Sequence, residues 1–299
     1  MALQALWDVP APAKLNLFLH IVGRRPDGYH LLQSVFVLID WCDMLHLERR
    51  SDAQLRRHDL GPAPADNMCL PADDLCLRAA RALQQASGCT LGADISIVKR
   101  LPWGAGLGGG SSDAASTLLA LNRLWGLHWP RDRLQALAVT LGADVPFFIG
   151  GQAAFVEGIG ERLTPLALPP QWLAVVKPAQ GILTASIFAS PLLERHTDDV
   201  IVQDFLANVQ RCQGRIEGYG GNDLQAAAQS LCPEVCEVSA WLDARFGNSR
   251  MTGSGSAVFA RAGTGDQPVA TWGADELPQH WVGRMCRSLD HHPLVGWAG

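Results

Sequence analysis

The sequence predicts an α+β protein, in which short strands and amphipathic helices share one chain of 299 residues. The first fifty residues contain apolar runs of strand length. Residues 73–87 place apolar side chains at helical spacing. A further strand-like stretch then runs through a glycine-rich loop into a second helical pattern. A chain of this length can bury a full core, and its length favours two domains or one large one.

A sheet is expected to open the fold. Residues 11–48 read APAKLNLFLHIVGRRPDGYHLLQSVFVLIDWCDMLHLE, in which apolar runs flank a Pro-Asp-Gly sequence at 26–28. Such a tripeptide is typical of a tight turn between strands. The segment therefore predicts two strands joined by that turn.

A helix follows over residues 73–87, where Leu75, Ala79 and Leu83 fall on one face and Gly88 supplies a stop. The next stretch, ADISIVKRLP at 93–102, predicts a strand that ends at its proline. After the glycine-rich stretch LPWGAGLGGGSSDAAS at 101–116, a second helix is expected, with Ser111, Ser112 or Asp113 as its cap. The predicted order is strand, glycine loop, helix.

This order suits a phosphate group. Glycine allows positive φ and lets the backbone approach a ligand, while the start of a helix offers unpaired N–H groups and a positive dipole end. Ser111 and Ser112 add hydroxyl groups that can bind phosphate oxygens or a phosphate-bound magnesium ion.

The loop alone leaves several chemistries open. Gly104, Gly106 and Gly109 fit the spacing of a dinucleotide-binding turn, and Asp132 lies about where a ribose-binding acid is expected. The Walker pattern and the H-R-D and D-F-G motifs of protein kinases do not occur in the sequence. A glycine-rich turn without a ligand is the remaining alternative.

Composition narrows the function classes. With 48% hydrophobic and 18% charged residues the chain resembles soluble globular proteins, and no apolar run reaches the length of a membrane span. The net charge of −5 argues against a general nucleic-acid binder. The N-terminal residues lack a secretory pattern, which predicts a cytoplasmic protein. Eight cysteines without a C-x-x-C pair predict reduced thiols rather than a zinc site.

Three stretches resemble the signature regions of the GHMP kinases, small-molecule kinases named for galactose, homoserine, mevalonate and phosphomevalonate. They are PAKLNLFLHI at 12–21, LPWGAGLGGGSSDAA at 101–115 and MTGSGSAVFA at 251–260. The longer strings around them, including RRPDGYHLLQS, LGADVPFFIGGQAAFVEGIGE and the NDL at 222–224, are similar to the branch that phosphorylates 4-diphosphocytidyl-2-C-methyl-D-erythritol. The likeness covers most of residues 8–262.

The resemblance implies a two-domain fold. An N-terminal domain of the ribosomal protein S5 domain 2 type is expected over residues 1–165, and a ferredoxin-like α+β domain over 166–299, with the active site between them. The implied reaction moves the γ-phosphate of ATP to the 2-hydroxyl group of the cytidylated acceptor. Magnesium is expected to arrive on ATP, without a metal site of the protein's own.

The resemblance also assigns residues to roles. Asp144 matches the catalytic base, and Lys14 matches the lysine that orients it. From spacing alone, Asp144 would instead be a capping residue before Pro146, and Lys14 a solvated strand lysine. The implied ATP-binding set is Pro102, Gly104, Gly106, Leu107, Gly108, Gly109, Gly110, Ser111 and Ser112. The implied acceptor-binding set is Asn16, Tyr29, His30, Thr184 and Phe188, in which the aromatic rings suit a cytosine.

Two positions depart from the family pattern. Asp74 stands where asparagine is common beside the adenine pocket, and Trp103 where the side chain is usually smaller. The residues after about 263 carry little family signal, and His291 and His292 are expected in a solvated turn.

The expected partners are ATP and the cytidylated substrate, with neither nucleic acid nor membrane, and the expected state is a monomer or weak homodimer. A sister kinase acting on mevalonate, homoserine or a sugar is the main rival, and a non-catalytic nucleotide-binding relative is a second.

Overall fold

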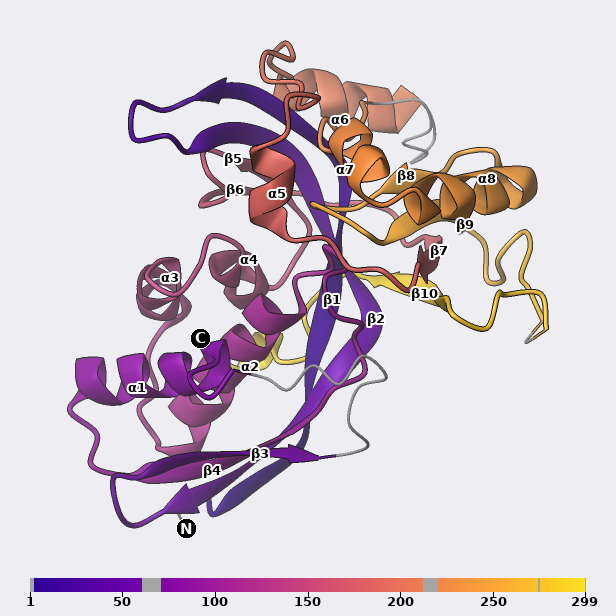
Figure 1. The fold of residues 1–299 in the computed structure, drawn as a ribbon. Helices are drawn as coiled ribbons and strands as arrows, with labels where there is room; N and C mark the ends of the chain where they lie inside the picture. The colour runs from indigo at the N-terminus through magenta and orange to yellow at the C-terminus, as the bar shows by residue number, and fades with distance from the viewer. Residues whose placement is uncertain (1–2, 61–70, 212–219, 274, 299) are drawn as a thin grey trace.

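The computed structural model describes residues 3–60, 71–211, 220–273 and 275–298. Two long strands, β1 (Ala5–Arg24) and β2 (His30–Arg50), form an antiparallel hairpin that runs through the molecule (Figure 1). The turn between them contains the Pro-Asp-Gly sequence at 26–28, as predicted, and Gly28 has a φ of 94°. The hairpin is the frame to which the other elements attach.

Runs of helices follow runs of strands along the rest of the chain, and the structure confirms the predicted α+β class. The first half adds β3 (Leu55–Leu60), α1 (Leu75–Ser87), β4 (Gly92–Val98), α2 (Gly109–Leu124), α3 (Arg131–Val139), α4 (Val145–Gly150), β5 (Ala154–Glu157) and β6 (Arg162–Pro165). The second half adds β7 (Trp172–Lys177), α5 (Thr184–Phe188), α6 (Val202–Arg211), α7 (Gln225–Leu231), α8 (Glu234–Phe246), β8 (Arg250–Met251), β9 (Val258–Gly263), β10 (Val282–Leu289) and the 3₁₀ turn η1 (Val295–Trp297).

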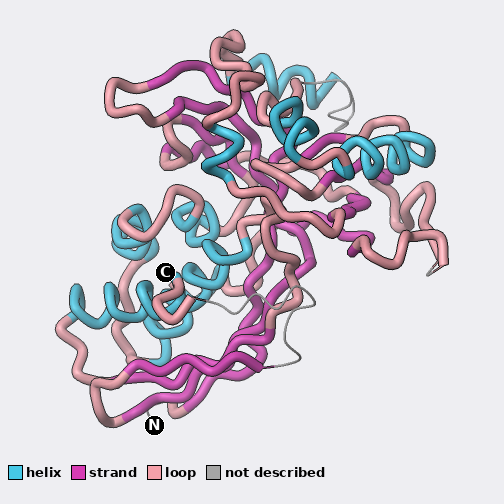
Figure 2. The backbone as a smooth tube through the Cα atoms, in the orientation of Figure 1, coloured by secondary structure: helices cyan, strands magenta, loops and turns pink. Residues whose placement is uncertain are grey.

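One sheet connects the two halves. One edge of β2 pairs with β1, and its other edge pairs in turn with β5, with β10 and with β4. Strand β10 pairs antiparallel with β7 as well, and β7 pairs with β9, so that the second half continues the same sheet. Helices α1 to α4 gather on one side of the first-half strands (Figure 2).

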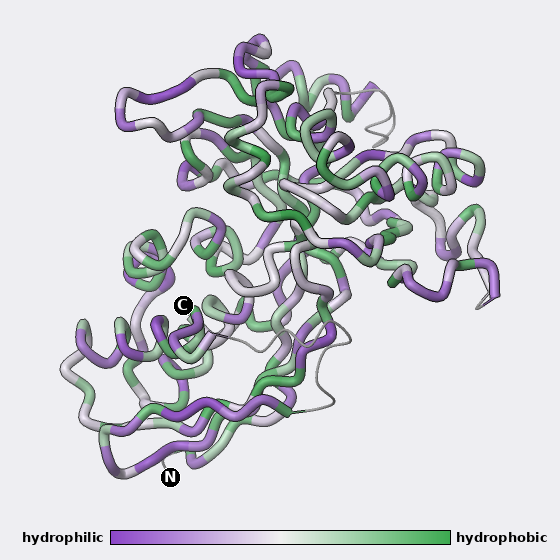
Figure 3. The backbone as a smooth tube through the Cα atoms, viewed as in Figure 1, coloured by the Kyte–Doolittle hydropathy of each residue, from purple (hydrophilic) through white to green (hydrophobic). Residues whose placement is uncertain are grey.

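Apolar side chains form three buried clusters. One lies between the first-half sheet and α1 to α4, and another lies under α7 and α8 in the second half. The third contains Leu15 and Phe155 of the first half together with Val175, Phe205 and Phe259 of the second. Figure 3 shows hydrophobic colour along the central strands and hydrophilic colour at the β1–β2 turn.

Helix α1 has the predicted position and stop. Asp74 caps its start by accepting a 3.0 Å hydrogen bond from the backbone N–H of Leu77, and Gly88 ends it in the left-handed conformation.

The predicted cap of α2 is wrong. Gly108, with a φ of 71°, is the N-cap, and Ser111, Ser112 and Asp113 lie inside the helix. A left-handed glycine starts this helix in place of a capping side chain, so no side chain of the N-cap residue accepts from the first N–H groups.

The last residues return to the first half, and the chain end lies beside α2 in Figure 1. The expected solvated turn at 291–292 is wrong for His292, which is buried, while His291 is exposed. The Nδ1 atom of His292 accepts a 3.1 Å hydrogen bond from the backbone N–H of Leu294. Burial lowers the pKa of His292 to about 3, so the ring stays neutral. The division near residue 165 stays a prediction.

None of the helices in the described ranges has the length and apolar character needed to cross a bilayer. Six of the eight cysteines lie among the described residues, and all six are free thiols. Cys69 and Cys212 fall outside the described part of the chain.

Candidate active site

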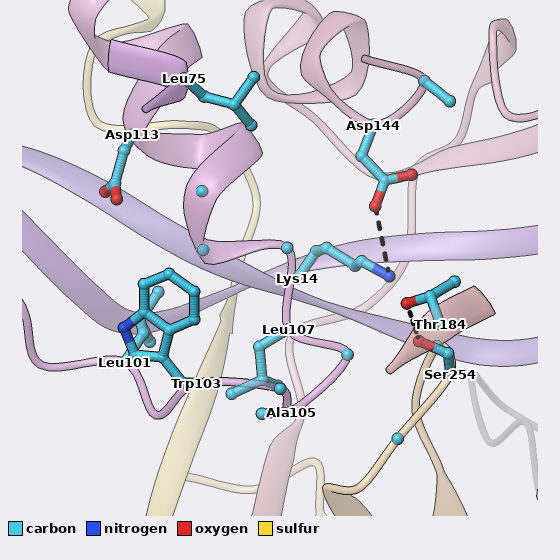
Figure 4. Close-up of a pocket in the computed structure, with 18 of the residues that line it drawn as sticks. Lys14, Leu75, Leu101, Trp103, Ala105, Leu107, Asp113, Asp144, Thr184 and Ser254 are labelled. Atoms are coloured by element: carbon cyan, nitrogen blue, oxygen red, sulfur yellow. Dashed lines mark hydrogen bonds and ion pairs between the residues drawn. The ribbon is translucent and has the colours of Figure 1, made fainter. Parts of the chain in front are cut away.

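A cavity of about 650 Å³ lies where the glycine loop meets β1, α1, α4, α5 and the loop at 253–255. Figure 4 shows Lys14 and Asp144 pointing toward each other, with Trp103 on one side of them and Thr184 and Ser254 on the other. The predicted catalytic pair, Lys14 and Asp144, lines the cavity together with Thr184 and Phe188 of the predicted acceptor-binding set. Both parts of the predicted site therefore open into one cavity.

Lys14 and Asp144, 130 positions apart in sequence, meet in this cavity. The Nζ atom of Lys14 lies 3.8 Å from Oδ2 of Asp144. Asp144 occupies the N-cap position of α4, but its side chain makes no capping hydrogen bond. Its carboxylate instead faces the lysine, as Figure 4 shows, and its side chain is 32% exposed. An ionised carboxylate open to the cavity can accept a proton from a bound hydroxyl group.

The surroundings of Lys14 fix its direction. The side chain is buried, and Nζ donates to Oδ1 of Asn16 and lies 4.7 Å from the centre of the Phe36 ring. Burial lowers the pKa of Lys14 below its ordinary value, and the charge of Asp144 opposes that shift. The Nδ2 atom of Asn16 donates to Oγ of Ser34 at 2.9 Å, so Asn16 orients the lysine from behind.

The glycine loop ends at the start of α2. The first N–H groups of an α-helix have no acceptor within the helix, and at α2 they belong to residues that line the cavity, Gly109 and Gly110. A Cβ atom at Gly108 would lie 3.0 Å from Phe148 Cζ and 3.1 Å from Lys14 Cγ. Glycine at this position lets the loop pack closely against α4 and β1.

A second loop, residues 251–256, packs against the first. The N–H of Ser256 donates to the carbonyl of Gly104 at 2.8 Å, and the N–H of Ala257 donates to that of Ala105 at 3.2 Å. Asn222, the first residue of the NDL string, donates through Nδ2 to the carbonyls of Met251 and Gly253. Hydrogen bonds thus hold the second loop from both sides.

Most residues predicted to bind ATP line the cavity. Ser112 is different, because its hydroxyl donates to the carbonyl of Pro12 at 2.6 Å and its N–H donates to that of Gly108. Neither group of Ser112 is left for a phosphate. Asp132, the acid of the dinucleotide alternative, lies in the first turn of α3 and not in the cavity lining. The predicted residues in the lining are Pro102, Gly104, Gly106, Leu107, Gly108, Gly109 and Gly110.

Acceptor-side residues come together in part. The ring of His30 stacks on Phe188 with centroids 4.9 Å apart, and Phe188 lines the cavity. Tyr29 is 61% exposed at the β1–β2 turn. The hydroxyl of Thr184 lies 2.8 Å from that of Ser254 in the second loop, beside Lys14 in Figure 4.

Comparison with known proteins identifies the family. Residues 74–152 match the family described as the GHMP kinases N terminal domain. A 4-diphosphocytidyl-2-C-methyl-D-erythritol kinase of Methylibium petroleiphilum is 64% identical over 301 residues and covers 100% of both chains. A kinase of the same name from a Polaromonas species is 54% identical and covers 99% of this chain and 95% of its own. The chain belongs to the 4-diphosphocytidyl-2-C-methyl-D-erythritol kinase family.

Solved structures agree with membership of this kinase family. A crystal structure of 4-(cytidine 5'-diphospho)-2C-methyl-D-erythritol kinase is 35% identical, with a TM-score of 0.70, and covers 93% of this chain and 98% of its own. A homoserine kinase from Cytophaga hutchinsonii, at 16% identity and a TM-score of 0.64, covers 97% and 95% and shows the fold alone. The predicted GHMP kinase fold is confirmed. The chain is therefore a kinase, and its family implies ATP as the phosphate donor.

One charged cluster was not predicted, and two of its three members, Lys99 and Asp113, line the cavity. Lys99 donates to Asp43 and, at 2.7 Å, to Asp113 in α2, and both carboxylates are buried. Asp43 also accepts from the backbone N–H groups of Arg100 and Leu101. The sequence signals for this cluster were a carboxylate in the apolar run of β2 and Asp113, which was expected to cap α2 instead.

Both departures from the family pattern lie in the cavity wall. Asp74 caps α1 through Oδ1, and its Oδ2 atom lies 3.5 Å from Nη1 of Arg57. The charge of this buried carboxylate is therefore partly balanced by a cation that the sequence pattern did not reveal. The indole of Trp103 lines the cavity near the glycine loop.

Proposed function

We propose that the chain transfers the γ-phosphate of ATP to the 2-hydroxyl group of 4-diphosphocytidyl-2-C-methyl-D-erythritol, on the non-mevalonate route to isoprenoid precursors. The observation that carries the proposal is the Lys14–Asp144 pair at 3.8 Å, open to a cavity that the glycine loop also lines. A relative at 64% identity over the whole chain carries this substrate in its name.

In the proposed mechanism, Asp144 accepts the proton of the attacking hydroxyl group. The hydroxyl oxygen forms a bond to the γ-phosphorus, the bond from that phosphorus to the β–γ bridging oxygen breaks, and ADP leaves with that oxygen. Lys14 keeps Asp144 in place and offsets negative charge on the migrating group. The reaction then depends on positioning, which the buried contacts of Lys14 support.

The glycine loop and the start of α2 are proposed to bind the ATP phosphates through backbone N–H groups. Magnesium, which neutralises phosphate charge when bound, is proposed to enter with ATP. The described residues contain no group of three or more His, Cys, Asp or Glu side chains that could hold a metal ion.

The acceptor is proposed to lie between α5 and the β1–β2 turn. Phe188 and His30 offer ring faces to a cytosine, and a base that entered between them would replace their direct contact. Thr184, whose hydroxyl lies 2.8 Å from that of Ser254, is proposed to bind the polyol or its phosphates. Tyr29 and Asn16 stay in the predicted acceptor set, Tyr29 through its exposed ring and Asn16 through its contact with Lys14.

We further propose the cytoplasm as the site of action, a monomer or weak homodimer as the working state, and no nucleic-acid or membrane partner. The net charge of −5 argues against a nucleic-acid partner, and both proposed substrates are small molecules. The assay described next therefore contains neither nucleic acid nor membrane.

The reaction is tested by incubating the full chain with ATP and magnesium and with one acceptor at a time. The acceptors are 4-diphosphocytidyl-2-C-methyl-D-erythritol, mevalonate, homoserine and galactose, and phosphorus NMR locates the new phosphate. We expect phosphate on the 2-hydroxyl group of the cytidylated acceptor only. Turnover with a different acceptor alone would favour a sister kinase, and ATP binding without any turnover would favour a non-catalytic relative.

Asp144→Asn tests the assigned base. The substitution keeps the shape but removes the proton acceptor, so kcat should fall by about 10²–10⁴ while the Kd for ATP stays within about threefold. Steady-state kinetics and nucleotide titration give both values. Asp132→Asn, which changes a carboxylate outside the cavity lining, should leave kcat unchanged. Near-normal turnover in Asp144→Asn would remove Asp144 from the mechanism.

A further inference from the structure

Helix α4 carries the proposed base but is too short to hold its own position. It spans six residues, and isolated helices of this length do not form in water. Asp144 lies at its start, and Phe148 in its middle packs where a Cβ atom at Gly108 would be only 3.0 Å away. The position of α4 therefore sets both the Asp144–Lys14 distance and one wall of the glycine loop.

The C-terminal end of α4 is bound by groups from elsewhere in the chain. Nη1 of Arg131, the first residue of α3, donates to the carbonyl of Ile149. The N–H of His292 donates to the carbonyl of Gly151 at 2.7 Å. These two bonds satisfy carbonyls at and just beyond the last turn of α4, where a helix leaves its C=O groups unpaired.

Arg131 also binds the chain end, residues 290–298, which we call the C-terminal strap. Its Nη2 atom donates to the carbonyl of Val295 and, at 2.9 Å, to that of Ala298. Leu294 and Ala298 are buried in the cluster that contains the apolar side chains of α4. One guanidinium group thus joins the strap to the helix that carries Asp144.

We propose that the C-terminal strap, through Arg131 and His292, holds α4 in the position at which Asp144 faces Lys14. Arg131 is then a positioning residue for phosphoryl transfer, although it does not line the cavity. The inference rests on the proposed function, because it takes Asp144 as the base. A displacement of about 1 Å in a catalytic group can cost about a hundredfold in rate. Loss of the strap contact should therefore appear in kcat.

Arg131→Met tests this inference, because methionine keeps apolar bulk but donates no hydrogen bond. We expect kcat to fall at least about tenfold. The KM value for the cytidylated acceptor should stay within about twofold, since α5 is not attached to the strap by these bonds. Steady-state kinetics well below the melting temperature separates the two parameters.

Arg123→Met is the matched control. Arg123 also contacts the strap, since its guanidinium lies 5.0 Å from the centre of the Trp297 ring. Within the described part of the chain, it makes no hydrogen bond to α4, unlike Arg131. This variant should keep kcat within about twofold even if its melting temperature falls as far as that of Arg131→Met. Leu294→Ala, which loosens the strap itself, should lower kcat, and the combination with Arg131→Met should cost less than the product of the two losses.

The possible outcomes are distinct. If the wild type turns over the cytidylated acceptor and Asp144→Asn does not, but Arg131→Met keeps the wild-type kcat, the strap inference is wrong and the proposed function stands. If Arg131→Met raises KM and spares kcat, the strap supports binding rather than the base, and the inference also fails. A wild type without turnover overturns the function itself. If Arg131→Met does not fold, Arg131→Lys replaces it, because lysine lacks the planar fork that reaches both α4 and the strap.

Discussion

Lys99 lies between two buried carboxylates, and this arrangement has one negative charge more than positive. Burial raises the pKa of Asp113 to about 7, and the nearby Asp43 adds to the shift, while Lys99 opposes it. Although burial alone would lower the pKa of Lys99, the carboxylates of Asp113 and Asp43 raise it, so the lysine stays charged. The folded protein therefore keeps a proton on Asp113 that the unfolded chain releases near pH 4.

Asp113→Asn should change how stability depends on pH. Between about pH 4 and pH 7 the folded wild type binds one more proton at this site than the unfolded chain, so its free energy of unfolding falls as pH rises. The asparagine variant lacks that titration and keeps an acceptor for Lys99. Its free energy of unfolding relative to wild type should rise by about 1 kcal/mol per pH unit across this window.

Urea unfolding at a series of pH values measures this difference. Asp27→Asn is the control for a change of surface charge, since Asp27 is an exposed turn residue paired with Arg25 at 2.6 Å, and its free energy of unfolding should stay within about 1 kcal/mol of wild type. A flat difference for Asp113→Asn would show that Asp113 ionises in the folded state as it does in the unfolded chain.

At the residue scale, the role of a residue could be predicted from the sequence only where it lies in a stretch that resembles a family motif. Lys14 and Asp144 were assigned through the resemblance, because spacing alone favoured a solvated lysine and a capping aspartate. Their 3.8 Å approach depends on packing between β1 and α4, which no local pattern encodes. The partners of Ser112 and Asp74 were hidden for the same reason, since Pro12 and Arg57 reach them only in the folded chain.

Among the elements, the glycine loop and the loop at 251–256 form one backbone assembly. Gly106 has a φ of 72°, and a Cβ atom there would lie 2.3 Å from the carbonyl oxygen of Thr252. That distance is shorter than any real Cβ contact, and the obstructing atom is backbone. The loops can therefore meet only if residue 106 is glycine.

Gly106→Ala should separate the two loops. We expect a loss of about 2–4 kcal/mol in the free energy of unfolding, from backbone strain and from the overlap with Thr252, together with weaker ATP binding. Gly88→Ala is a matched control, because Gly88 has a similar φ of 67° but no atom within 4 Å of the added Cβ. It should cost only about 1 kcal/mol and leave ATP binding intact.

Chemical denaturation and nucleotide titration of both variants give the comparison. Equal losses of unfolding free energy in the two variants would mean that left-handed backbone strain alone causes the effect. The loops would then move apart at residue 106 without a further cost.

Elements with strong periodicity were predictable, and those defined by distant contacts were not. The helix at 73–87 was recovered with its stop at Gly88, and the Pro-Asp-Gly turn was recovered as well. The start of α2 was misassigned, because a left-handed Gly108 replaces the expected side-chain cap. The C-terminal strap carried no signal, since its role comes from Arg131 and from burial against α4.

At the scale of the whole molecule, the two halves share both a sheet and a core. Ser288 and Leu289 of β10 pair with Ile39 and Leu38 of β2, and the strap continues from β10 onto the first half. The shared cluster joins first-half side chains such as Leu15 to second-half side chains such as Val175. Opening the junction would expose this cluster to water and break the sheet. The free energy lost when the shared sheet and the shared cluster separate should therefore couple the unfolding of one half to that of the other.

We expect one cooperative unfolding transition, with a calorimetric-to-van't Hoff enthalpy ratio of about 1. Leu83→Ala removes apolar volume from the first-half core and Val238→Ala from the second-half core, and both side chains are fully buried. Leu83→Ala should cost about 2–5 kcal/mol and Val238→Ala somewhat less, because fewer methyl groups are lost. Because the halves are coupled, each variant should move the whole transition to lower temperature without splitting it. Two peaks in scanning calorimetry, with each variant moving only one of them, would show that the halves on either side of residue 165 unfold independently despite the shared sheet.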